Sequence, residues 1–201
     1  MGSGMCMGRR SDHNRDELEE LILAAGSALI AEVGLSGFSA REVARRIGYS
    51  IGTIHNVFGS IDRLIVAINT RSFVAWTGDL RRALEAAGDG DRIAALVDGY
   101  FAFAQTNPNL WTAIYDHRLA LTDLSDDDQT ARGALTEIVV TEIARALARP
   151  ADQQVNTLAR SLIATVHGHC AFAVSGAWTL MGEAAPEAAA LARVRETLAA
   201  P

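Results

Sequence analysis

The chain has 201 residues, nearly half of them apolar and only four of them proline, so it can bury a sizeable core and suits a mostly helical protein. Its net charge of −6 excludes a protein that coats nucleic acid with its whole surface, so any DNA binding has to come from a local surface. The two cysteines, Cys6 and Cys170, exclude a disulfide framework and fit a reducing cytoplasm.

Residues 1–11 are expected to form a disordered leader, and an amphipathic helix is expected over residues 12–34. Arg9 and Arg10 precede an apolar run, which is also how a secretory signal begins. Acidic side chains stand at residues 16–20, however, where such a signal would be basic. No other stretch reaches transmembrane length without a charge. We therefore predict a cytoplasmic protein with no membrane partner.

Residues 39–64 carry the most informative pattern in the chain. Ser39, followed three residues later by Glu42, forms a capping-box pattern that predicts the start of a short helix. Gly48 then supplies the backbone freedom that a tight helix end requires.

A second short helix is predicted directly after this turn. Ser50 can cap it, and Ile54 and Phe58 would form its inner face. Two short helices joined by a glycine-containing turn are the helix-turn-helix signature. With the preceding helix they predict a three-helix DNA-binding domain over residues 12–60.

The same stretch resembles the DNA-binding domain of TetR/AcrR-type transcriptional regulators. The residues in register with that family's pattern are Phe38, Ser39, Arg41, Val43, Ala44, Gly48, Ser50, Gly52, Thr53, Ile54 and Phe58, followed by Ser60 and Leu64. The resemblance covers about the first third of the chain and is only architectural beyond it. It implies contact with double-stranded DNA through Ser39, Arg41, Ser50, Ile51, Gly52, Thr53, His55, Asn56, Val57 and Ser60.

Individual roles are expected for three of these residues. The resemblance implies that Arg41 holds a phosphate. Thr53 can hydrogen-bond a phosphate or a base edge, and Asn56 has a side chain that pairs bidentately with adenine. Each of them is a plain surface residue if this stretch does not meet DNA.

Three departures from the family's pattern reduce the number of phosphate-binding groups. His55 stands where the family usually has tyrosine, and Ile51 and Ile61 stand where long polar or basic side chains are common. A dimer that senses a ligand but binds DNA weakly therefore stays open as an alternative.

The remainder of the chain, residues 61–201, is expected to form a helical ligand-binding and dimerisation domain. Helices are predicted over residues 61–88, 91–105, 110–119, 152–180 and 186–198, with a further helix that ends near residue 149. Residues 122–129 contain four Asp and are expected to be a solvated loop. Since no segment alternates as a strand does, the predicted fold class is all-α.

Aromatic and polar side chains of this domain are candidates for a small-molecule site, because such sites are mostly apolar with a few polar groups. The predicted pocket residues are Trp76, Phe101, Gln105, Trp111, Tyr115, His117 and His167. The alternative is that most of these aromatics are simply core.

A helix as long and apolar as residues 152–180 has to be covered on more than one side, which predicts a homodimer interface. The residues predicted for that interface are Leu162, His169, Ala173 and Gly176. His167 and His169 cannot both bind one metal ion, because residues two apart on a helix point about 200° away from each other. We expect no metal and no cofactor.

Together these patterns predict a TetR-like repressor that binds a palindromic operator as a homodimer and is released by a small, mostly apolar effector. An all-helical enzyme is the rival class. The sequence has no phosphate-binding glycine loop, no metal constellation and no nucleophile beside a base at workable spacing, so we predict that the protein is not an enzyme.

Overall fold

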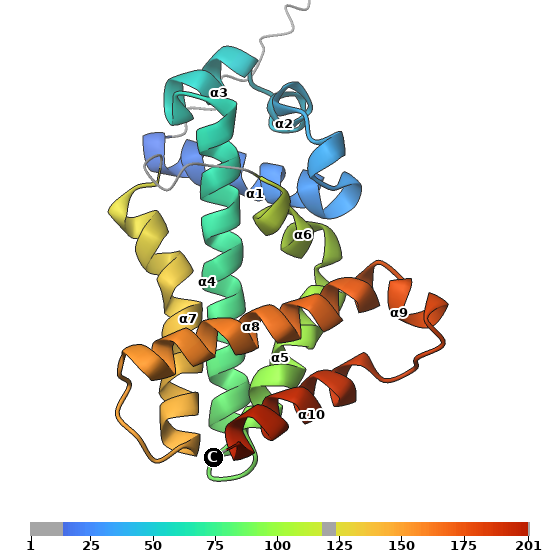
Figure 1. The fold of residues 1–201 in the computed structure, drawn as a ribbon. Helices are drawn as coiled ribbons and strands as arrows, with labels where there is room; N and C mark the ends of the chain where they lie inside the picture. The colour runs from blue at the N-terminus through green and yellow to red at the C-terminus, as the bar shows by residue number, and fades with distance from the viewer. Residues whose placement is uncertain (1–13, 118–123, 201) are drawn as a thin grey trace, which may run out of the picture.

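The computed structural model describes residues 14–117 and 124–200, so the expected leader at residues 1–11 lies outside the described residues. Within the described part every regular element is helical, which confirms the all-α fold class. The elements labelled in Figure 1 are α1 (Arg15–Val33), η1 (Leu35–Gly37), α2 (Ala40–Arg46), α3 (Ile51–Phe58), α4 (Ile61–Ala87), α5 (Arg92–Thr106), α6 (Pro108–Asp116), α7 (Asp126–Ala146), α8 (Gln153–Val174), α9 (Ala177–Leu180) and α10 (Pro186–Ala199).

The first helix begins later than predicted because Asn14 caps it. The Asn14 side chain accepts a hydrogen bond from the Glu17 N–H at 2.9 Å, and the Glu17 carboxylate accepts from the Asn14 N–H at 3.0 Å. This reciprocal pair satisfies two N–H groups that have no partner inside the helix. The chain leaves the helix at Gly34, whose φ is 71°.

Helix α2 does not begin with the predicted capping box. Ser39 occupies the N-cap position, but its side chain makes no capping hydrogen bond. Glu42 pairs instead with Arg45 at 2.7 Å and with Arg46 at 3.0 Å. Hydrogen bonds between two charged groups are stronger than a bond to a backbone N–H, so the two guanidinium groups hold this carboxylate away from the cap.

The turn between α2 and α3 follows the prediction. Gly48 adopts φ 75°, which favours glycine, and the Tyr49 N–H returns to the Ala44 carbonyl at 2.9 Å to close the end of α2. Ser50 then caps α3, since its side chain accepts from the Thr53 N–H.

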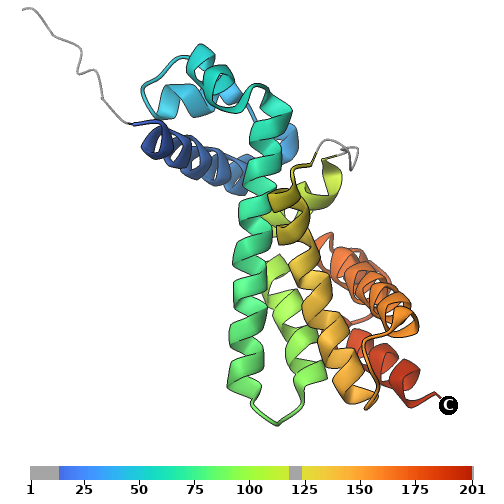
Figure 2. The same cartoon turned by 90° about the vertical axis from the view of Figure 1, so that its left-hand side faces the viewer.

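Two hydrophobic cores lie along the molecule, and α4 runs through both (Figures 1 and 2). The N-terminal core packs α1, α2 and α3 against Leu64 and Ile68 of α4. The C-terminal core contains Trp76 and Leu80, which lie further along the same helix.

Helix α6 also belongs to both cores. Ala113 is fully buried in the N-terminal core, whereas Trp111 and Ile114 are buried in the C-terminal core. Two side-chain bonds fix this position, because the Asn69 amide donates to the Ala113 carbonyl at 3.2 Å and Asn109 donates to the Ala31 carbonyl at 2.8 Å.

In the C-terminal part, α4, α5 and α7 lie side by side (Figure 2), and α8 and α10 cross one face of them (Figure 1). A bidentate ion pair joins α5 to α7, with both Arg92–Glu142 hydrogen bonds at 2.6 Å. Arg92 also donates to the carbonyls of Leu84 and Gly88 at the end of α4. One guanidinium therefore ties three helices together.

Two predicted boundaries in this part are wrong. The solvated loop over residues 122–129 ends at Ser125, since Ser125 and Asp128 form a capping box and the acidic side chains of the first turn lie at the positive end of the α7 dipole. Residues 122 and 123 lie outside the described residues. The predicted helix 152–180 is broken at Gly176, where φ is 77°, so that α8 and the short α9 are separate.

Over residues 14–117 and 124–200, no single helix is both long and apolar enough to cross a membrane. The pair α3 and α4 meets that test together, with a bend of 69° between them.

Candidate DNA-binding surface and effector cavity

Helix α3 presents a polar face to solvent and an apolar face to the N-terminal core. Ile54 is fully buried, whereas Ser50, His55 and Asn56 are exposed. Gly52 is also exposed, and because it has no side chain it allows a DNA backbone to approach α3 closely. The outer face can therefore offer a hydroxyl, an imidazole and an amide to base edges in a major groove.

The other predicted DNA-binding residues differ in how available their side chains are. Thr53 is half-buried, and its hydroxyl lies 3.2 Å from that of Ser50. Ile51 and Val57 pack partly against the N-terminal core, so little of either side chain faces outward. Ser60 is engaged as the N-cap of α4, where it accepts from the Arg63 N–H at 3.1 Å.

Arginines supply the positive charge near α3, and most of it is already paired. Arg46 binds Glu32 at 2.7 Å as well as Glu42, and it thereby joins α2 to α1. Hydrogen bonds from Arg45 and Arg46 lower the pKa of the Glu42 carboxyl to about 2. Within the described part of the chain, Arg41 is exposed and makes no ion pair.

Two further arginines near this surface were not among the predicted DNA-binding residues. Arg15 begins α1 and donates to the Val57 carbonyl at the end of α3, at 3.5 Å. Arg63 is exposed in the first turn of α4. Arg63 could have been predicted from the sequence, because it is a basic residue three positions after Ser60. The position of Arg15 depends on a tertiary contact that no local pattern reveals.

Several of the predicted pocket residues lie close together in the C-terminal core. Trp76, Phe101 and Trp111 are buried, and the rings of Trp111, Tyr115 and His167 pack against one another with centroids 4.2–5.4 Å apart. That these side chains line a ligand pocket stays a prediction.

Two of the predicted pocket residues lie elsewhere. Gln105 is exposed and donates to Glu187 of α10 at 2.7 Å. His117 ends α6 and lies 3.3 Å from Asp62 of α4, beside the N-terminal core. Their printed partners, Glu187 and Asp62, lie outside the aromatic cluster.

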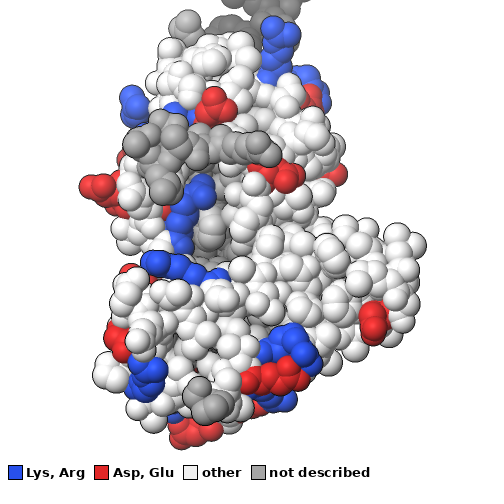
Figure 3. Space-filling view, viewed as in Figure 1, with Lys and Arg blue, Asp and Glu red and all other residues white. Residues whose placement is uncertain are grey.

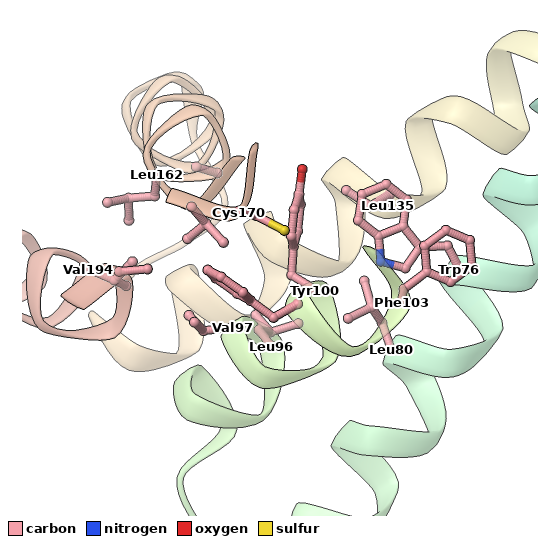
Figure 4. Close-up of a cluster of buried hydrophobic side chains, with 14 of the residues drawn as sticks. Trp76, Leu80, Leu96, Val97, Tyr100, Phe103, Leu135, Leu162, Cys170 and Val194 are labelled. Carbon is pink, nitrogen blue, oxygen red and sulfur yellow. The ribbon is translucent and has the colours of Figure 1, made fainter. Parts of the chain in front are cut away.

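An apolar cavity of about 40 Å³ lies instead between α5, α7, α8 and α10. Its walls include Val97, Tyr100, Ile143, Leu162, Val166 and Val194. Figure 4 shows the side chains of Leu162, Val194 and Val97 on one side of a cluster of buried side chains, with the Tyr100 ring standing beside Cys170. Leu162 was predicted for the dimer interface, and that prediction is wrong because its side chain is buried inside the protomer.

The remaining predicted interface residues lie on or near the edge of the outer face of α8. His169 is partly buried, and its ring lies 5.1 Å from that of Trp178 with the two planes tilted by 42°. Ala173 packs partly against the C-terminal core, and Gly176 is exposed after the helix end. Thr157, Ser161, Ala164, Gly168 and Phe172 are exposed along one side of α8, and Gln153, Gln154 and Arg160 are exposed near its start. The first five form a strip of mostly small side chains, in a region that Figure 3 shows as largely uncharged.

His167 and His169, considered above as metal ligands, have different hydrogen-bond partners. His167 Nδ1 lies 3.0 Å from the Tyr100 hydroxyl, and His169 Nδ1 lies 2.8 Å from the Thr165 carbonyl. Over residues 14–117 and 124–200, no three His, Cys, Asp or Glu side chains come together in a group that could hold a metal ion.

Comparison with known proteins gives matches over both parts of the chain. A model of bacterial regulatory proteins of the tetR family matches residues 22–68, and a model of the tetracyclin repressor-like C-terminal domain matches residues 93–197. No curated protein matches the sequence.

Solved structures share the fold over nearly the whole chain. A protein of unknown function from Rhodococcus sp. RHA1 is 24% identical with a TM-score of 0.73, over 95% of this chain and 97% of that one. A TetR-family transcriptional regulator from Streptomyces coelicolor is 25% identical with a TM-score of 0.57, over 92% and 95%. The multidrug binding protein EbrR, solved with imidazole, is 21% identical with a TM-score of 0.64, over 94% and 98%.

The arrangement of α2 and α3 is that of a helix-turn-helix, and the match to the C-terminal family model alone spans more than half of the 201 residues. The chain belongs to the TetR family of bacterial transcriptional regulators.

Proposed function

We propose that the protein is a homodimeric repressor that binds a palindromic operator through α3 and is released by a small, mostly apolar effector. The observation that carries the proposal is the outer face of α3, where Ser50, His55 and Asn56 are exposed while Ile54 anchors the helix in the core. A helix held in this way can enter a major groove without losing its packing.

The outer face of α8 supports a dimer. Ala164, Gly168 and Phe172 are exposed on one side of a helix whose opposite side, with Leu162 and Val166, is buried in the C-terminal core. Small side chains let two helices approach closely, and a symmetric pair of such faces is self-complementary. A dimer would place the two copies of α3 in successive major grooves, about 34–36 Å apart.

The shared helices support coupling between effector and operator. Helices α4 and α6 contribute residues to both cores. A shift of either helix in the C-terminal core therefore also moves the residues against which α1, α2 and α3 pack. An effector releases the operator only if it binds the non-binding arrangement more tightly than the binding one.

Gel-shift titration over a range of salt concentrations, with DNA from upstream of the protein's own gene, tests DNA binding. Asn56→Ala should weaken binding to the preferred sequence about 5- to 150-fold, because a bidentate contact to adenine contributes about 1–3 kcal/mol of discrimination. The matched control is Asn156→Ala, which removes an amide that bonds within α8, to the Asp152 carbonyl at 2.9 Å. Equal affinities for the two variants would contradict the role of Asn56.

A second candidate function is a ligand-sensing dimer that binds DNA weakly. The charges near α3 favour this weak-binding function. Helix α3 has no Lys or Arg, and both Arg45 and Arg46 are paired with acidic residues. The same titration separates the two functions, because the weak binder would show no preference for any sequence over competitor DNA.

A further inference from the structure

A network of four charged side chains lies on the solvent side of α2, the helix that precedes α3. The Arg45 guanidinium donates two hydrogen bonds to the Glu42 carboxylate, both at 2.7 Å. Arg46 donates to the same carboxylate at 3.0 Å, and it makes two more bonds to Glu32 of α1, at 2.7 and 2.8 Å. Two carboxylates therefore neutralise two arginines in the free protein.

The two arginines are held to different degrees. Arg46 has a partner on each of two helices, and its side chain is only 29% exposed, so it is part of the packing of α2 on α1. Among the described residues Arg45 is bound by Glu42 alone, and its side chain is 74% exposed. An ion pair as exposed as this one is weak and yields readily to a competing charge. Glu42 is therefore the group that decides whether Arg45 is free.

Arg45 lies on a side of α2 that is expected to meet DNA. Residues four apart on a helix share one side, so Arg45 follows one turn after Arg41. Both side chains are exposed, whereas Val43 and Ala44 face the N-terminal core. The family resemblance implies that Arg41 holds a phosphate. A free Arg45 beside it would add a second phosphate contact, which carries no base-sequence information.

We propose that Glu42 is a positioning residue that limits sequence-independent DNA binding by holding Arg45 away from phosphate. The inference rests on the proposed function, because it matters only at a surface that meets DNA. With Arg45 neutralised, the polar groups of α3 carry a larger share of the affinity. Hydrogen bonds from Arg45 and Arg46 lower the pKa of the Glu42 carboxyl to about 2, so the carboxylate stays charged at physiological pH.

Binding to a duplex of arbitrary sequence tests this role without an operator. Glu42→Gln frees Arg45 and should raise affinity for the duplex at low salt. Each neutralised phosphate adds about 0.9 to the slope of log affinity against log salt, so the slope should steepen by about 0.9 for each subunit on the DNA. Between about 50 and 200 mM salt, the advantage of the variant should shrink about 3.5-fold per subunit. Fluorescence anisotropy of the labelled duplex measures both quantities.

Glu32→Gln is the matched control, because it removes the same charge from the same network. Arg45 keeps both of its bonds in that variant, and Arg46 keeps its bond to Glu42, so the slope should stay that of the unaltered protein. Equal slopes for the two glutamine variants would overturn the proposal. A Glu42→Gln protein that binds the duplex no better than the unaltered protein would overturn it as well.

Variants of Arg45 identify the cation. Arg45→Ala alone should leave the slope nearly unchanged, because Glu42 already neutralises the guanidinium. The same change combined with Glu42→Gln should reverse the steepening, since no freed cation remains. A clear loss of slope in the single variant would show that Arg45 already contacts phosphate, and would contradict the role of Glu42. Steepening that persists in the double variant would contradict it too.

A search for an operator keeps the two proposals apart. A protein without any sequence preference contradicts the proposed repressor, yet the role of Glu42 stands if the slopes on the arbitrary duplex change as expected. A protein that prefers an operator, but whose Glu42→Gln and Glu32→Gln variants have equal slopes, contradicts the role of Glu42 alone.

Discussion

At the scale of single residues, the proposed DNA-binding surface offers neutral polar groups more than free positive charge. Helix α3 has no Lys or Arg, and the arginines of α2 divide into the paired Arg45 and Arg46 and the exposed Arg41. Few phosphates are then neutralised by each subunit. Operator affinity should depend less steeply on salt than for a protein with many basic contacts.

Replacement of Arg41 tests which cation contacts phosphate. Because each released counterion changes the slope of log affinity against log salt by about 0.9, Arg41→Ala in both subunits should reduce that slope by about 2. Gel-shift titration at several salt concentrations gives the slope. Arg81→Ala, at an exposed position far along α4, is the control, and an equal change in both variants would contradict a phosphate contact at Arg41.

His55 is expected to contact DNA, because it is exposed on the outer face of α3. His55→Ala should weaken operator affinity, since the variant loses a ring that can hydrogen-bond a phosphate or a base edge, whereas His169→Gln in α8 should bind as the unaltered protein does. Gel-shift titration at fixed salt measures both variants. Equal affinities of the unaltered protein and His55→Ala would show that His55 does not contact DNA.

Local patterns predicted single caps and turns well where the residue had one available partner. Ser50 and Gly48 take the predicted roles, because a hydroxyl beside free N–H groups or a glycine at a positive φ has little competition. Ser39 and Glu42 did not, because Arg45 and Arg46 compete for the same carboxylate.

At the scale of helices, the joint between α4, α5 and α7 depends on one buried ion pair. The Glu142 side chain is only 7% exposed and accepts both of its hydrogen bonds from Arg92. Arg92→Met should lower the free energy of unfolding by about 3–5 kcal/mol, because it leaves a carboxylate buried without a partner. Urea denaturation at fixed protein concentration measures the loss.

The double variant shows whether the unpaired charge is the cause. Arg92→Met combined with Glu142→Met removes both charges and should recover most of the lost stability. If the double variant is no more stable than Arg92→Met alone, the loss comes from packing at the end of α4.

The sequence predicted which helices exist but not which side of α8 faces the protomer. Leu162 and Gly168 both belong to a helix that is apolar on most sides, yet Leu162 lines the cavity and Gly168 is exposed. Hydrophobic periodicity separates buried from exposed positions and cannot separate burial within a protomer from burial against a second copy. The same limit applies to the aromatic cluster, because composition does not reveal whether rings enclose a space or fill it.

At the scale of the whole molecule, the proposed dimer depends on the outer face of α8. A Cβ added at Gly168 meets no atom within 4 Å, and the residue is exposed, so Gly168→Arg should leave the fold intact. In a dimer the same arginine would lie between two packed helices and should dissociate it. Sedimentation at micromolar concentration should show dimers of the unaltered protein and monomers of the variant.

Gly133→Arg is the control for the dimer prediction. Gly133 is also helical, and an added side chain there likewise meets no atom within 4 Å, but it lies on α7. This variant should remain dimeric. An unaltered protein that sediments as a monomer would contradict the dimer itself.

The sharing of α4 and α6 limits how this regulator can be recombined with others. A DNA-binding segment that ends at residue 60 would lack Leu64, Ile68 and Ala113, three of the fully buried residues around which α1, α2 and α3 pack. Such a segment, grafted onto a foreign sensor, should fold only if the recipient supplies equivalent side chains in the same places. Specificity is therefore exchanged more safely by substituting the outer residues of α3 than by transplanting the segment as a cassette.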